Sequence, residues 1–183
     1  MYTLAEGAPG DPRAENEAAV YRFLTGLSIP FFRIDHEPVR TMEDCQAIDR
    51  ALGGEICKNL FLCNQQKTQF YLLMIREDKA FKTKDVSRQL GVSRLSFGPP
   101  EMMARLLHLS PGAVSPMGLL FDSARDVRLI MDGDLKKADQ LGCHPCVNTA
   151  SIRLPMRDFL QIYLPATGHA PTFVTIPKEE IAS

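Results

Sequence analysis

Two apolar runs in the middle of the chain, residues 58–63 and 69–75, are separated by a short polar stretch at residues 64–68. Strands joined by so short a loop pair as an antiparallel hairpin, because a parallel crossover needs a connection of a dozen residues or more. The fold must therefore contain a sheet with antiparallel neighbours.

The flanking segments supply helices and further strands. Helical spacing of apolar residues predicts helices over residues 41–53 (with Thr41 as the cap), 83–91 and 99–107, and a last helix from residue 155 onward. Before them, an amphipathic helix is predicted from the spacing of Val20, Phe23, Leu24 and Leu27. Strand patterns occupy residues 31–35, 119–121, 127–131 and 146–154. Because strands and helices do not alternate regularly, we expect an α+β fold: a single domain with a mixed, largely antiparallel sheet flanked by helices.

Length and composition favour one globular domain. A chain of 183 residues with 45% hydrophobic residues can bury a core of its own. We expect a flexible N-terminal tail over residues 1–13, which are rich in Gly, Pro and Ala, a folded domain over residues 14–177, and a C-terminal tail over residues 178–183. Without a long apolar span or a secretory signal pattern, the five cysteines are best read as reduced thiols of a cytoplasmic protein that binds no membrane.

The net charge of -1 argues against a protein that coats nucleic acid by bulk electrostatics, and it makes DNA an unfavoured partner. The net charge does not exclude a local contact with nucleic acid. Between Arg76 and Arg94, six basic residues stand against three acidic ones. This stretch is either a solvated face or a patch that touches a phosphate backbone.

The sequence Cys143-His144-Pro145-Cys146 has the spacing of a redox C-x-x-C pair. A redox pair normally opens a helix, however, and here the chain continues into a predicted strand. A zinc site would need further ligands at matching spacing. We therefore interpret the cysteines as packing residues and expect neither a metal nor a cofactor, with a thiol oxidoreductase kept as an alternative.

Three short polar clusters border predicted strands: Lys58-Asn59, the loop at residues 110–118, and residues 144–152. Polar groups inside apolar stretches need partners, so the three clusters suggest one cleft. Gly112 permits close approach of the backbone to a ligand, and amides in its loop could stabilise an oxyanion. Lys58 could hold a phosphate or ribose oxygen. Taken singly, the lysine, the loop and the histidine have ordinary structural interpretations.

In order and spacing, these three clusters resemble the motifs of the YbaK/ProX aminoacyl-tRNA deacylases. The closest resemblance is to the freestanding PrdX or ProXp-ala branch, which is related to the editing insertion of bacterial prolyl-tRNA synthetases. It extends from about Glu15 to about Thr175. It implies the YbaK fold and hydrolysis of the ester that joins a wrong amino acid, alanine in this branch, to tRNA(Pro). A synthetase pocket shaped for proline cannot strongly reject a smaller amino acid, so a second site must remove it.

The resemblance also implies residue roles. Lys58 would anchor the terminal adenosine, Asn59 and His144 would position the ester or the attacking water, and amides from Gly112 to Ser115 would meet the oxyanion. The substrate-binding set would comprise Ile34 and Cys45 as pocket walls, Asn148 as a residue that orients the His144 segment, and the loop residues Ala113, Val114, Pro116 and Gly118. The family is thought to lack a protein general base and to use a ribose hydroxyl of the tRNA.

Two positions depart from the branch: Phe121-Asp122 replaces a common Asn-Asp pair, and Cys146 stands where leucine is frequent. The expected partners are aminoacylated tRNA(Pro) and, through recruitment, prolyl-tRNA synthetase. The alternatives are a deacylase for cysteinyl- or another small aminoacyl-tRNA, and a non-catalytic regulator that binds aminoacyl-tRNA.

Overall fold

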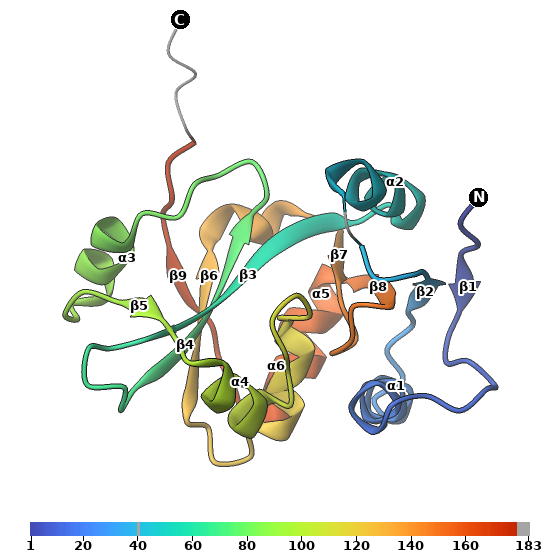
Figure 1. The fold of residues 1–183 in the computed structure, drawn as a ribbon, viewed down its shortest axis with the longest axis horizontal. Helices are drawn as coiled ribbons and strands as arrows, with labels where there is room; N and C mark the ends of the chain where they lie inside the picture. The colour runs from blue at the N-terminus through green and yellow to red at the C-terminus, as the bar shows by residue number, and fades with distance from the viewer. Residues whose placement is uncertain (40, 179–183) are drawn as a thin grey trace, which may run out of the picture.

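The computed structural model describes residues 1–39 and 41–178. Its strands are β1 (Ala5–Glu6), β2 (Phe32–Asp35), β3 (Glu55–Cys63), β4 (Phe70–Arg76), β5 (Ser96–Phe97), β6 (Val127–Asp132), β7 (Gln140–Cys143), β8 (Ala150–Pro155) and β9 (Thr172–Val174). They form one sheet in the order β1-β2-β8-β7-β3-β4-β6-β9, with β5 paired to β3 (Figure 1). The pairs β3–β7, β4–β6 and β6–β9 are parallel and the others antiparallel, which confirms the expected α+β class.

The predicted hairpin is present as β3 and β4, and its loop is closed by Asn64, whose side chain accepts from the amides of Thr68 and Gln69. Strand β4 alternates between two cores. Phe70, Leu72 and Met74 join one apolar cluster, and Tyr71, Leu73 and Ile75 join the other. A strand that is buried on both faces reads as a continuous apolar run, as this one does.

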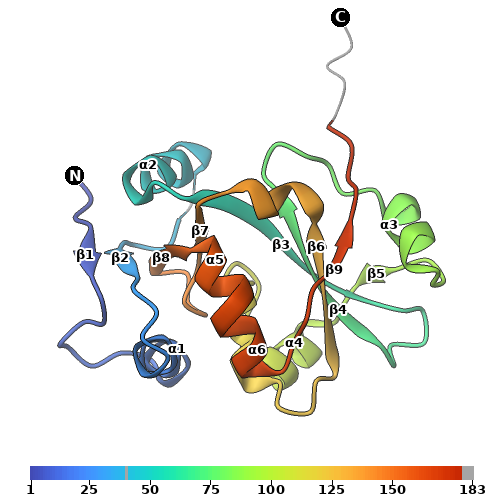
Figure 2. The same ribbon diagram turned by 180° about the vertical axis from the view of Figure 1, so that it is seen from behind.

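Helices cover both faces of the sheet. They are α1 (Glu15–Gly26), α2 (Met42–Leu52), α3 (Thr83–Leu90), α4 (Pro100–Leu107) and a C-terminal helix built from α5 (Met156–Asp158), the π-helical turn η3 (Phe159–Tyr163) and α6 (Leu164–Thr167). Helix α3 packs on the smaller cluster, and α1, α4 and the C-terminal helix pack on the larger one. Figure 2 shows the C-terminal helix between α1 and β9. None of the helices in the described residues is long and apolar enough to cross a membrane.

Helix α2 begins as predicted. The Thr41 hydroxyl accepts from the Asp44 amide at 3.1 Å and donates to the Asp44 carboxylate at 2.7 Å, and Gly53 ends the helix in the left-handed conformation. Ile48 and Leu52 are buried. The helix lies over the end of the sheet where β7 and β3 meet (Figure 1).

Two predicted strands are wrong in part. Residues 119–121 belong to a 3-10 helix, η1 (Pro116–Phe121), because Ser115 caps it and Pro116 starts it. Residues 146–149 form a turn in which Cys146 has a φ of 66°, so β8 begins only at Ala150. The short strands β1, β5, β7 and β9 carry too few residues for their patterns to be recognised.

The N-terminal segment differs from the expected loose tail. Ala5 and Glu6 pair with Arg33 and Phe32 of β2. Further along, the Arg13 guanidinium contacts the Asp35 carboxylate at 2.8 Å. The expected C-terminal tail lies outside the described residues, except for its first residue, Lys178.

Candidate active site

A cavity of about 270 Å³ opens where α2, β3, the loop before η1 and the turn after β7 meet. Its lining residues come from these four segments and from β7 and β8: Asp49, Leu52, Ile56, Cys57, Asn59, Gly112, Val114, Gly142, Cys143, His144 and Ser151. Sites for whole drug-sized ligands usually measure about 300 to 1,000 Å³. This cavity therefore suits a small group at the end of a larger ligand.

His144 follows β7 directly, and its ring is fixed by one hydrogen bond. Its Nδ1 lies 2.8 Å from the Ala150 carbonyl oxygen. A carbonyl only accepts, so in the neutral ring Nδ1 carries the proton and Nε2 is left as an acceptor. Burial lowers the pKa of His144, the bond to Ala150 opposes this shift, and the charge of nearby His36 adds to it. The imidazole is therefore neutral at pH 7 and can accept a hydrogen bond from water or a hydroxyl.

Ser115 ties the glycine loop to His144. Its side chain is fully buried, and its hydroxyl donates to the carbonyl oxygen of His144 while it accepts from the Met117 amide at 3.1 Å. Two segments 29 residues apart in sequence are thus held together at the cavity. Ser115 itself does not line the cavity, so it is a positioning residue rather than one that touches substrate.

Gly112 lies in the same loop with a φ of 88°, in the left-handed region. An added Cβ would meet only the Asn148 Nδ2, at 4.0 Å, so backbone conformation rather than space requires glycine here. The Ala113 amide is already bonded to the Ser110 carbonyl at 3.0 Å. Of the loop residues that line the cavity, Gly112 and Val114 therefore have the amides that could contact an oxyanion.

Asn59 contributes a buried polar group without a partner. Its Oδ1 is buried and accepts no hydrogen bond within the described part of the chain, and its Nδ2 makes only a long contact of 3.5 Å with the Cys57 carbonyl. Leaving such an atom unsatisfied costs about 1–3 kcal/mol. A ligand or water in the cavity can supply the missing donor.

Lys58, although next to Asn59, points away from the cavity. Successive residues of a strand face opposite sides of the sheet. The exposed Lys58 side chain donates instead to the carbonyl oxygen of Lys79 at 2.8 Å. Lys79 in turn is buried in ion pairs with Asp132 and Asp134, each at 2.8 Å. The structure therefore separates Lys58 from Asn59 and His144.

The expected pocket walls lie behind or beside the cavity. Ile34 is fully buried in β2 opposite Ser151, and Cys45 is half-buried on α2; neither lines the cavity. Pro116 and Gly118 are buried in η1, where a Cβ at Gly118 would lie 2.7 Å from the Leu107 carbonyl oxygen. Ala113 is buried behind the loop as well. Asn148 is exposed and next to Gly112.

Sequence reasoning missed Asp49, which reaches the cavity from α2. The apolar spacing of this helix points to Cys45, Ile48 and Leu52 as its inner stripe. Asp49 is four residues after Cys45, on the same side of the helix as that proposed wall. This spacing is the signal that could have found it.

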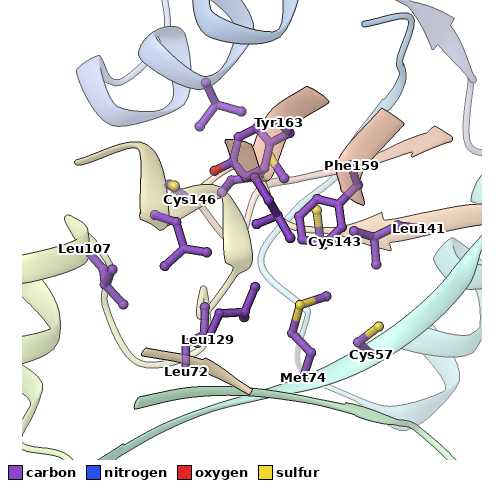
Figure 3. Close-up of a cluster of buried hydrophobic side chains, with 14 of the residues drawn as sticks. Cys57, Leu72, Met74, Leu107, Leu129, Leu141, Cys143, Cys146, Phe159 and Tyr163 are labelled. Atoms are coloured by element: carbon purple, nitrogen blue, oxygen red, sulfur yellow. The ribbon is translucent and has the colours of Figure 1, made fainter. Parts of the chain in front are cut away.

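Cys143 and Cys146 lie among apolar side chains of the core, with Tyr163 and Phe159 nearby (Figure 3). Burial raises the pKa of Cys143 to about 12 and raises that of Cys146 as well. Both sulfurs are therefore protonated thiols at neutral pH, and neither residue opens a helix. Within residues 1–39 and 41–178, no group of three or more His, Cys, Asp or Glu side chains could hold a metal ion.

Asp122, which follows the departing residue Phe121, has a structural role. Its buried carboxylate accepts from the amides of Asp126 and Val127 and contacts His169 Nε2, each at 2.9 Å. These bonds close the turn into β6 and fix the end of the C-terminal helix. Asp122 is not among the residues that line the cavity.

Fold and cavity together define a small α+β protein that presents a backbone loop, an amide side chain and a neutral imidazole to one compact ligand group. The chain belongs to the aminoacyl-tRNA editing domain family, whose model matches residues 36–162. It is accordingly an aminoacyl-tRNA deacylase, a hydrolase of carboxylic esters.

Relatives extend over most of the chain. The prolyl-tRNA editing protein ProX of Acetoanaerobium sticklandii is 33% identical over 144 residues, which are 79% of this chain and 88% of the relative. A prolyl-tRNA synthetase associated domain-containing protein 1 of Danio rerio is 31% identical over 170 residues, 92% of this chain and 89% of the relative. A crystal structure of a protein described as a trans-editing enzyme for prolyl-tRNA synthetase superposes with a TM-score of 0.68 at 18% identity, covering 92% of this chain and 100% of the other. That likeness shows a shared fold.

Proposed function

We propose that this protein is a trans-editing deacylase that hydrolyses alanyl-tRNA(Pro). The observation that carries the proposal is the compact cavity in which Asn59, Gly112 and His144 meet. The names of the relatives support tRNA(Pro) as the nucleic acid. A cavity of about 270 Å³ has room for a small acyl group of the kind that a synthetase site built for proline fails to reject.

The reaction needs a placed water and a stabilised oxyanion. Water attacks the carbonyl carbon of the ester, the carbonyl oxygen becomes an oxyanion, and the C–O bond to the ribose then breaks. In this proposal the amides of Gly112 and Val114, two residues that line the cavity, donate to the oxyanion, which is the kind of contact that contributes most to acyl transfer. The products are free amino acid and a tRNA whose ribose hydroxyl has taken up a proton.

In this scheme His144 orients the attacking water and does not act as the general base. Because burial lowers its pKa, the neutral ring is a weak base, yet Nε2 still accepts a hydrogen bond from the attacking water or from the neighbouring ribose hydroxyl. Asn59 faces the same cavity and can donate through Nδ2 and accept through Oδ1. The ribose hydroxyl beside the ester then takes the proton of the water while it passes its own proton to the departing ribose oxygen.

Lys58 has a different role in the proposal. Its ammonium lies on the other face of β3, where it can meet a phosphate only as the tRNA passes the sheet outside the cavity. Replacing it should therefore weaken tRNA binding. We expect Lys58→Ala to raise KM and to leave kcat within about twofold, since uniform binding affects KM alone.

The test is deacylation of alanyl-, cysteinyl- and prolyl-tRNA(Pro) by the wild-type protein, each corrected for spontaneous hydrolysis. The proposal expects rapid loss of the alanyl ester and little loss of the prolyl ester. Faster cleavage of the cysteinyl ester would instead establish the cysteine-specific alternative. Tight binding of the three tRNAs without turnover would contradict the proposal and favour a regulator.

A further inference from the structure

Asp49 brings a carboxylate to the wall of the same cavity, from helix α2. Its side chain is half-buried, and within the described residues it forms no ion pair and accepts no side-chain hydrogen bond. The neighbouring Arg50 is exposed on the helix. A carboxylate that is partly withdrawn from water usually has a cationic partner or hydrogen-bond donors.

The surroundings of Asp49 disfavour its charge. Burial raises the pKa of its carboxyl to about 6, and the charge of Glu77 adds to the rise, whereas Arg50 and His36 oppose it. The group is nevertheless ionised at pH 7.5. The cavity wall therefore carries a negative charge that forms no ion pair within the described residues.

We infer that Asp49 is the subsite for the α-ammonium group of the aminoacyl ester. This inference rests on the proposed deacylase function and deepens it. The ammonium is the one cation in the aminoacyl end of such a substrate, and it is attached to the carbon next to the ester carbonyl. With the carbonyl at Gly112 and His144, the ester and its ammonium would share one cavity, whose lining includes Asp49.

The subsite makes a chemical distinction beyond size. A charge-assisted contact between ammonium and carboxylate favours esters of free amino acids over esters whose nitrogen is acylated or replaced by a hydroxyl. Peptidyl and hydroxyacyl esters would leave Asp49 unpaired. The enzyme would thus act on freshly charged tRNA and spare tRNA that carries a growing peptide.

The inference is tested with two matched substrates, alanyl-tRNA(Pro) and lactyl-tRNA(Pro), which differ only in an ammonium or a hydroxyl at the α-carbon. Each is hydrolysed by wild type, by Asp49→Asn and by the control Glu43→Gln, which removes a charge from the exposed first turn of the same helix. We compare kcat/KM of each variant with wild type on the same ester, so that the intrinsic labilities of the two esters cancel.

We expect Asp49→Asn to lower kcat/KM on the alanyl ester by about 10- to 100-fold, as for loss of a charged hydrogen bond, and to leave the lactyl ester within about twofold. Glu43→Gln should change neither. Equal losses on both esters, or no loss on either, would overturn the inference.

Binding separates this inference from the proposed function. If wild type hydrolyses neither ester, the proposed function fails. Affinity for the stable amide 3′-alanylamino-3′-deoxyadenosine then decides about Asp49. The subsite is supported if Asp49→Asn binds this alanyl amide at least tenfold more weakly than wild type, while both bind the corresponding lactyl amide equally. Equal binding of the alanyl amide by wild type and variant overturns it.

Discussion

The contact between Ser115 and His144 links the two loops of the cavity, and its removal should damage stability and catalysis together. In Ser115→Ala, the His144 carbonyl oxygen loses its donor and the Met117 amide loses its acceptor, in a place with no exposure to water. A buried group left unsatisfied costs about 1–3 kcal/mol. We expect a loss of about 2 kcal/mol, which corresponds to a fall in Tm of about 4–8 °C for a chain of this size.

The same change releases His144 from the glycine loop. A displacement of about 1 Å at a reacting group can cost about 100-fold in rate, so we expect kcat on alanyl-tRNA(Pro) to fall at least tenfold. Thermal unfolding and single-turnover deacylation measure the two effects. Ser110→Ala is the matched control, because Ser110 is in the same loop but is exposed. If Ser115→Ala and Ser110→Ala have the same Tm and the same rate, the link does not hold the site together.

Three further predictions concern charge and thiols. Asp49→Asn should raise stability at pH 8 by about 1 kcal/mol, because the rise in pKa from 3.8 to about 6 makes the ionised form cost about 3 kcal/mol before solvent screening of a half-exposed group; the penalty is complete above about pH 6, and the gain in Tm should shrink as the pH falls from 6 toward 4. Cys143 and Cys146 should resist a thiol reagent in the folded protein at pH 8, and a reversible disulfide between them would instead support a redox function. A further pocket on α3 is lined by Lys82, Thr83, Lys84, Ser87, Arg88, Val92 and Arg94. The double variant Lys84→Glu/Arg88→Glu should weaken tRNA binding and lower its salt dependence if this pocket touches phosphates, whereas an unchanged salt slope would make it a solvated face.

Much of the scaffold could be predicted from local chemistry. The β3–β4 hairpin follows from two apolar runs and a polar loop, and the start of α2 follows from the Thr41–Asp44 cap. The strand predicted over residues 119–121 is wrong, because the apolar run also fits the 3-10 helix that Pro116 begins. The turn over residues 146–149 depends on the left-handed conformation of Cys146. Because this residue is not a glycine, the sequence does not indicate that conformation.

The residues of the candidate site were likewise predictable only in part. Motifs far apart in the chain place Asn59, Gly112 and His144 on one cavity, as the resemblance implied. Lys58 does not line the cavity, and its ammonium donates to the carbonyl oxygen of Lys79, a placement that the motif alone does not express. Asp49 escaped notice because a charged residue on an amphipathic helix is ordinarily assigned to solvent.

The central claim is that this cavity hydrolyses the aminoacyl ester through the neutral ring of His144. The most direct measurement is the single-turnover rate of alanyl-tRNA(Pro) deacylation by wild type and by His144→Ala, which removes the ring but keeps the main-chain carbonyl that Ser115 contacts. We expect a loss of about 100-fold or more, with the fold retained as judged by circular dichroism. A folded variant that deacylates at the wild-type rate would contradict the account.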